Sequence, residues 1–292
     1  MRIWTGRAGS GKTTAILREI AALSEKGEGR QILLVPELNS HLMERRPAAA
    51  PHNHGARTAE VLTFSRLADR VFSEVGGLAQ QMLTPAGQLL TLQEAARRVQ
   101  GGLSAWKGLA DKPELLQEAL RLIDECKTCA VAPETLFAAA EESEDAVLAE
   151  KLSDLAQILT AYERLCEESL PDPRDRLTHL RDRLAESHTL DGAAVYLDGF
   201  LGFTAQESAV VDAMLAAGVP LSAAVTCDTD YPEIFLTGCK TVQKLTRMAK
   251  HHNQTVERIE LGASKVARPE GLAALERESL LPVRTPQESA AG

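Results

Sequence analysis

The chain has 292 residues, of which 44% are hydrophobic and 25% are charged, so it can bury the core of one large domain or two ordinary ones. Its formal net charge of −9 excludes a general electrostatic attraction to DNA or to acidic membranes, so any nucleic-acid contact needs a local basic strip. No apolar run approaches the roughly 18 residues of a membrane span, and no signal peptide is recognisable. Five cysteines, an odd number, do not suggest a disulfide framework, so we expect a cytoplasmic protein.

The first predicted strand, residues 2–4, leads into GRAGSGKT, which matches the phosphate-loop pattern G-x-x-x-x-G-K-[ST] in full. Glycines let successive backbone amides turn toward phosphate, and the helix predicted over residues 13–26 adds its positive end. We expect Lys12 to reach the β- and γ-phosphates and Thr13 to ligate Mg²⁺. The predicted nucleotide-binding residues are Gly6, Arg7, Ala8, Gly9, Ser10, Gly11, Lys12, Thr13 and Thr14. The alternative is an ordinary glycine turn.

Short β-rich runs follow at residues 32–35 and 61–63, and others come later at residues 195–197, 223–226 and 256–261. Helix-period segments lie between most of these runs, which predicts a parallel sheet with crossover helices. Residues 263–292 are rich in Ala, Gly, Pro, Ser and charge, with weak periodicity. They are predicted to form a weakly structured tail or linker.

The middle of the chain, residues 83–187, contains helix-period segments and no good strand. Thr84 and Pro85 are typical of a helix N-cap and first helical position, and further helical runs lie at residues 113–127, 132–140 and 146–168. This pattern predicts an all-helical insertion in an α/β domain. CKTC, at residues 126–129, has the gap of metal and redox motifs, but no second pair follows at zinc-like spacing, which favours a coincidence at a helix end.

Asp198 directly follows the strand predicted at residues 195–197. P-loop enzymes usually hold their magnesium with an acidic residue at the end of a neighbouring strand. Asp198 is therefore predicted to ligate Mg²⁺ together with Thr13. The alternative is a strand-end Asp that begins a turn with Gly199.

The segments GRAGSGKTTAIL, LLVPE, VLTFSRLA and VYLDGFLGFTAQE, in this order, resemble the B subunit of bacterial two-subunit helicase–nucleases, the AddB or RexB family. The resemblance extends to about residue 261. It implies a RecA-like P-loop NTPase lobe, built from residues 1–82 and 189–262. Residues 83–188 would form a helical insertion of the 1B type, followed by the tail at residues 263–292.

The resemblance also implies a role in double-strand break repair and homologous recombination, with ATP and Mg²⁺ as cofactors. It implies a helicase–nuclease A subunit as the partner and weak binding of single-stranded DNA, through Thr63, Phe64, Ser65 and Arg66. The alternative for Phe64 is a core position. The second motor lobe, the exonuclease domain and the iron–sulfur cysteines of the family are expected beyond this sequence, so no residue is assigned to nuclease chemistry.

Related helicases carry a Glu after the magnesium-binding Asp, where it acts as general base, and such proton handling is worth about 10²–10⁴ in rate. Gly199 occupies that position here, and Leu201 stands where a Gln often follows. Tyr231 falls where a γ-phosphate-sensing Gln is expected, and Glu207 lies on the next predicted helix. We therefore predict an ATP-binding lobe with weak or no hydrolysis and assign no catalytic residue.

Two alternatives remain open. A self-sufficient P-loop ATPase or kinase would need a catalytic base and a substrate lid within these residues. A structural module would keep only a vestigial nucleotide site.

Overall fold

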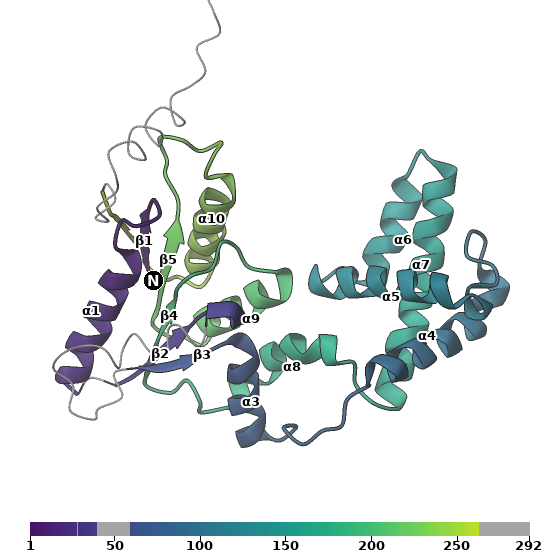
Figure 1. The fold of residues 1–292 in the computed structure, drawn as a ribbon, viewed down its shortest axis with the longest axis horizontal. Coiled ribbons are helices and arrows are strands. Elements are labelled where there is room, and N and C mark those ends of the chain that lie inside the picture. The colour runs from purple at the N-terminus through teal and green to yellow at the C-terminus, as the bar shows by residue number, and fades with distance from the viewer. Residues whose placement is uncertain (28, 40–58, 263–292) are drawn as a thin grey trace, which may run out of the picture.

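The computed structural model describes residues 1–27, 29–39 and 59–262. The tail predicted over residues 263–292 lies outside the described residues. A sheet lobe contains the two ends of the described chain, and a helical lobe is formed by its middle (Figure 1).

The sheet has six strands in the order β3-β2-β4-β5-β1-β6, and every neighbouring pair is parallel. The strands are β1 (Arg2–Gly6), β2 (Arg30–Leu34), β3 (Glu60–Leu62), β4 (Ala193–Leu197), β5 (Leu221–Thr226) and β6 (Glu257–Glu260). The central strands are apolar on both faces, as expected for a parallel sheet that helices cover on both sides. The predicted α/β architecture and its parallel sheet are confirmed.

Helices cover both faces of the sheet. Helix α1 (Lys12–Glu25) packs on the face that carries Trp4 and Leu33. The other face, which carries Ile3 and Ile32, is covered by α3 (Phe64–Val75), α9 (Ala205–Ala216) and α10 (Leu236–His251). Neighbouring residues such as Ile3 and Trp4 enter opposite cores because side chains alternate along a strand.

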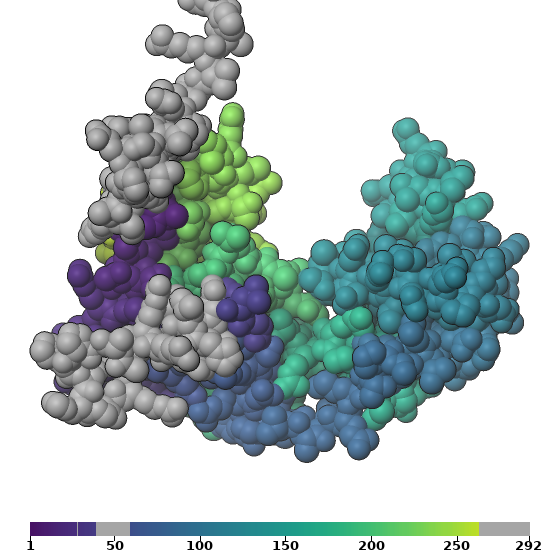
Figure 2. Space-filling view, viewed as in Figure 1, coloured from purple at the N-terminus to yellow at the C-terminus, as the bar shows by residue number. Residues whose placement is uncertain are grey.

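The helical lobe contains α4 (Pro85–Val99), α5 (Pro113–Thr128), α6 (Pro133–Glu142) and α7 (Ala146–Glu168). It has its own core around the fully buried Tyr162. Thr84 caps α4 as predicted, because its hydroxyl accepts a hydrogen bond from the Gly87 amide at 3.1 Å. Figure 2 shows an open space between this lobe and the sheet lobe on the face in view.

Helix α8 (Arg176–Arg183) lies within the predicted insertion but packs against α3 and α9 of the sheet lobe. Leu180 and Leu184 are buried in the same core as Ile3. The expected insertion ends at residue 188. In the structure the chain already packs against the sheet lobe at α8, before β4 begins.

A buried carboxylate, Asp172, fixes the point where the chain leaves the helical lobe. It accepts hydrogen bonds from Gln88 Nε2 at 2.8 Å, from the Tyr162 hydroxyl at 2.9 Å and from the Arg174 amide at 3.0 Å. Burial opposes ionisation, but these hydrogen bonds and the Lys127 ammonium outweigh it, so the pKa of Asp172 lies below its ordinary value. The carboxylate joins α4, α5 and α7 to the returning chain.

Replacing Gly238 with Ala should destabilise the sheet lobe, because a Cβ there would lie 1.9 Å from the Thr226 carbonyl oxygen, where α10 begins against the end of β5. We expect a cost of about 1–3 kcal/mol or more in the free energy of unfolding, measured with a denaturant. Gly101→Ala is the matched control, since no atom lies within 4 Å of its added Cβ. Equal unfolding midpoints for the two variants would contradict this close approach.

Candidate nucleotide site

The loop between β1 and α1 has a backbone that only glycines adopt without strain. Gly9 has φ of 79°, and Gly11, the N-cap of α1, has φ of 93°. A Cβ on Gly6 would lie 2.6 Å from the Ser10 hydroxyl and 2.8 Å from the Leu261 carbonyl oxygen. The glycines of the phosphate-loop motif therefore allow a tight turn that larger residues would open.

Unsatisfied hydrogen-bonding groups gather inside this turn. The amides in the first turn of a helix have no acceptor within the helix, and no described side chain caps α1. The Ser10 hydroxyl is buried, with the residue 1% exposed, and it makes no hydrogen bond with any described residue. Buried polar groups are normally paired, so a hydroxyl and amides left in this state fit an anion such as phosphate.

The Lys12 side chain bonds back to the loop. Its ammonium donates hydrogen bonds to the carbonyl oxygens of Gly6 and Arg7, both at 2.8 Å. Burial lowers the pKa of Lys12, and the negative charge of Asp198 opposes that shift. Asp198 therefore influences Lys12 electrostatically, although β5 separates β4 from β1 in the sheet.

Asp198 stands directly after β4 and is 3% exposed. Its amide donates to the Leu34 carbonyl oxygen at 3.1 Å, which extends the ladder between β4 and β2 by one residue. Asp198 and the first turn of α1, which contains Thr13, both follow the carboxyl ends of strands at the same edge of the sheet.

A contact that the sequence did not predict fixes the loop to the segment that follows β5. Arg7 Nε lies 2.5 Å from Asp228 Oδ2, and the guanidinium lies 4.9 Å from the centre of the Tyr231 ring. Burial alone would raise the pKa of Asp228, but hydrogen bonds from Arg7 and the Asp230 amide outweigh it, and the net pKa is lowered. The same hydrogen bond raises the pKa of Arg7.

Neither Gly199 nor Glu207 is placed as a general base. Gly199 has φ of 83°, a left-handed conformation that strains other residues. The Glu207 carboxylate accepts a hydrogen bond from the Thr204 amide at 2.8 Å, and the Thr204 hydroxyl accepts one from the Glu207 amide at 3.1 Å. This reciprocal pair is a capping box, so Glu207 serves to begin α9.

Comparison with known proteins identifies the family. Residues 3–276 match the family model described as ADDB, N-terminal. The chain belongs to the AddB N-terminal family. It is 36% identical over 293 residues to the B subunit of the ATP-dependent helicase/deoxyribonuclease of Desulforudis audaxviator, covering 95% of this chain and 25% of the relative. It is 33% identical over 264 residues to the protein of the same name from Acetivibrio thermocellus, covering 88% of this chain and 23% of the relative.

This AddB-family chain therefore spans about a quarter of the length of the curated relatives that it matches, with 25% and 23% of their lengths covered. The resemblance inferred from the four sequence segments is confirmed. Within the described residues, no helix combines the length and the apolar character needed to cross a membrane.

The residues expected to contact DNA divide into two pairs. The Thr63 hydroxyl caps α3 by accepting a hydrogen bond from the Arg66 amide at 3.2 Å, and Thr63 is 1% exposed. Phe64 is 5% exposed, and its ring packs edge-on against Phe200 with centroids 5.6 Å apart. Ser65 and Arg66 are exposed. The burial of Phe64 agrees with the alternative of a core position.

The cysteines of the CKTC segment lie at the end of α5. Cys126 is buried, and burial raises the pKa of its thiol, whereas Cys129 is exposed. Across residues 1–27, 29–39 and 59–262, no group of three or more His, Cys, Asp or Glu side chains could hold a metal ion. The geometry gives this pair no metal partner in the described part of the chain.

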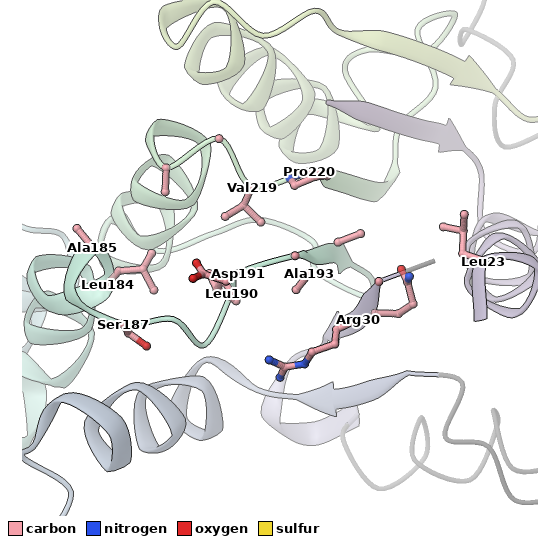
Figure 3. Close-up of a pocket in the computed structure, with 16 residues that line it drawn as sticks. Leu23, Arg30, Leu184, Ala185, Ser187, Leu190, Asp191, Ala193, Val219 and Pro220 are labelled. Atoms are coloured by element: carbon pink, nitrogen blue, oxygen red, sulfur yellow. The ribbon is translucent and has the colours of Figure 1, made fainter. Parts of the chain in front are cut away.

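A pocket of about 460 Å³ lies at the opposite edge of the sheet, near the amino ends of β2, β4 and β5 (Figure 3). Arg30 borders it, but its guanidinium already donates to the Thr189 carbonyl oxygen at 3.2 Å and to Glu60 at 3.4 Å. The loop with the phosphate-loop motif follows the carboxyl end of β1, so this pocket is not part of the candidate nucleotide site.

Ser10→Ala should change stability and nucleotide binding in opposite directions. Removing a buried hydroxyl without a partner should raise the free energy of unfolding of the ligand-free chain by about 1 kcal/mol, because an unpaired buried group costs about 1–3 kcal/mol. The same change should weaken Mg-ATP binding, since it removes a donor from the cradle. Chemical denaturation and a calorimetric titration measure the two effects. A destabilised variant with unchanged affinity would show that Ser10 has only a structural role.

Proposed function

We propose that this chain is the ATP-binding, RecA-like lobe of an AddB-type subunit of a bacterial helicase–nuclease, with weak or no hydrolysis of its own. The observation that carries the proposal is the glycine cradle with its unpaired Ser10 hydroxyl and uncapped α1, faced by the Asp198 carboxylate. Phosphate would satisfy the donors, and a divalent cation would offset the negative charge of Asp198.

The residues present fit Mg-ATP. The backbone from Gly6 to Thr14 and the Lys12 ammonium would hold the phosphates, and Thr13 and Asp198 would hold the metal. Bound Mg²⁺ would neutralise phosphate charge. The chain's own part is to orient the triphosphate at the carboxyl edge of the sheet.

The proposed weak hydrolysis rests on the lack of a general base at the two candidate positions. Gly199 offers no carboxylate to the attacking water, and the Glu207 carboxylate is engaged in capping α9. The lack of a free carboxylate at these two positions favours a lobe that holds nucleotide over a self-sufficient ATPase or kinase.

The curated relatives are named as the B subunit of an ATP-dependent helicase/deoxyribonuclease, which supports a role beside an A subunit in DNA double-strand break repair. Weak binding of single-stranded DNA is assigned to Ser65 and Arg66. Both are exposed at the start of α3, which follows the carboxyl end of β3 at the same edge of the sheet as the phosphate loop. Thr63 and Phe64 would position them. A cytoplasmic location fits this role.

The structural alternative also has an observation in its favour. Lys12 is already bonded to two carbonyl oxygens of the loop, and Arg7 is bound to Asp228. A loop closed on itself in this way could serve only to join β1 to β5.

Mg-ATP binding separates these two functions. Ligand at 100 times its dissociation constant stabilises by about 2.7 kcal/mol, so we expect the melting temperature to rise by on the order of 5 °C. Lys12→Ala should abolish the rise. Lys26→Ala, at the exposed C-terminal end of the same helix, should keep it. No rise in the unaltered chain would favour the structural module.

Gly199→Glu tests the missing base, with Gly199→Ala as its matched control. Both variants carry the strain of a side chain at φ of 83°, so their difference isolates the carboxylate. We expect phosphate release at saturating Mg-ATP to be about 10²-fold faster in the Glu variant than in the Ala variant, at the low end for a general base. Equal rates, with both variants still stabilised by Mg-ATP, would show that the base is not the limiting element.

A further inference from the structure

A groove of about 560 Å³ lies between α10 and β6, at the edge of the sheet farthest from β3. Val242 and Val256 are its apolar lining residues. Arg258 pairs with Ile3 in the β1–β6 register, so both side chains point to the sheet face that α10 covers. The other residues that line the groove are Gln243, Thr246, Arg247, Lys250 and Arg258.

The groove is basic, whereas the chain as a whole is acidic. Helix α10 contains four Lys or Arg residues and no acidic residue, whereas the whole chain has a net charge of −9. Arg247 and Lys250 are exposed, and neither forms an ion pair within the described residues. Arg258 donates to the Thr5 hydroxyl at 3.5 Å but contacts no described carboxylate. Glu260, on the same side of β6 as Arg258, forms no ion pair with these cations within the described part of the chain.

The lining chemistry matches phosphate. Arg, Lys, Gln and Thr side chains are the usual donors to the phosphate oxygens of nucleic acids, and no carboxylate lines this groove. We propose that the groove binds the sugar–phosphate backbone of duplex DNA. This inference rests on the proposed role of the chain in a DNA-processing enzyme, and it adds a contact surface separate from the nucleotide site and from Ser65 and Arg66.

The lack of aromatic rings on α10 and β6 favours duplex DNA over single-stranded DNA as the ligand. Neither α10 nor β6 contains Phe, Tyr or Trp, so these two elements offer no platform on which an unpaired base could stack. Duplex DNA keeps its bases stacked inside and presents phosphates outward. Contacts of this kind carry no sequence information, and we expect the binding to be independent of sequence and sensitive to salt.

The test compares two triple variants of the 292-residue chain with equal loss of charge. The groove variant is Arg247→Ala, Lys250→Ala and Arg258→Ala. The control variant removes three exposed cations of the helical lobe that form no ion pair within the described residues, with Arg97→Ala, Lys107→Ala and Lys151→Ala. Fluorescence anisotropy with a short blunt duplex, and separately with one of its strands, is recorded over a series of salt concentrations.

For the groove variant we expect at least a tenfold loss of duplex affinity. We also expect the slope of log affinity against log salt to become shallower by about 2–3, because each phosphate contact contributes roughly 0.9. The control variant should bind the duplex as the unaltered chain does. All three proteins should keep the thermal shift with Mg-ATP, which shows that the fold and the nucleotide site are intact.

Three results would overturn the inference: equal duplex binding by both triple variants, loss confined to the single strand, or no salt-dependent duplex binding by the unaltered chain. Loss of binding to the A subunit with unchanged duplex binding would assign the groove to a protein interface instead. Failure of the nucleotide proposal and failure of the groove proposal can be told apart. Absence of the Mg-ATP thermal shift in the unaltered chain rejects the nucleotide proposal, and the duplex-binding assay tests the groove independently.

Discussion

All strands of the sheet run in one direction, and this constraint determines where the site forms. Each parallel strand needs a crossover before the next, so the carboxyl ends of all strands meet at one edge. The phosphate loop follows β1, Asp198 follows β4 and Asp228 follows β5, so residues far apart in the chain become neighbours. The helical lobe lies within the long crossover from β3 to β4, and the buried Asp172 fixes the exit from that lobe.

Charged groups at this edge hold the loop in place. Lys12 is bound by the carbonyl oxygens of Gly6 and Arg7, and Arg7 is bound by Asp228. Phosphate would therefore replace the carbonyl oxygens as the acceptor for Lys12. The free energy gained at Lys12 is the difference between its contacts with phosphate and its contacts with the loop. The Ser10 hydroxyl and the first amides of α1 have no such competitor, so they account for more of the expected affinity. The same edge lacks a carboxylate at position 199, where the backbone itself favours glycine.

The sequence predicted those features that depend on local patterns. The glycine loop, the six short strands and the Thr84 cap are each encoded within a few residues. The contact between Arg7 and Asp228 joins residues 221 positions apart in the chain, and no local pattern predicts it. The packing of α8 on the sheet lobe was missed because helical period does not say which core a helix joins. The burial of Phe64 could not be decided either, since an aromatic residue after a strand suits both a core and a stacking surface.

The most direct test of the central claim is a crystal structure of the chain with Mg²⁺ and a non-hydrolysable ATP analogue. The account predicts the β-phosphate among the amides of the loop between Gly6 and Lys12, with the Ser10 hydroxyl donating to the bound phosphates. It also predicts Mg²⁺ bound between Thr13 and Asp198. Phosphates seated anywhere else, or a metal ion remote from Asp198, would contradict the account.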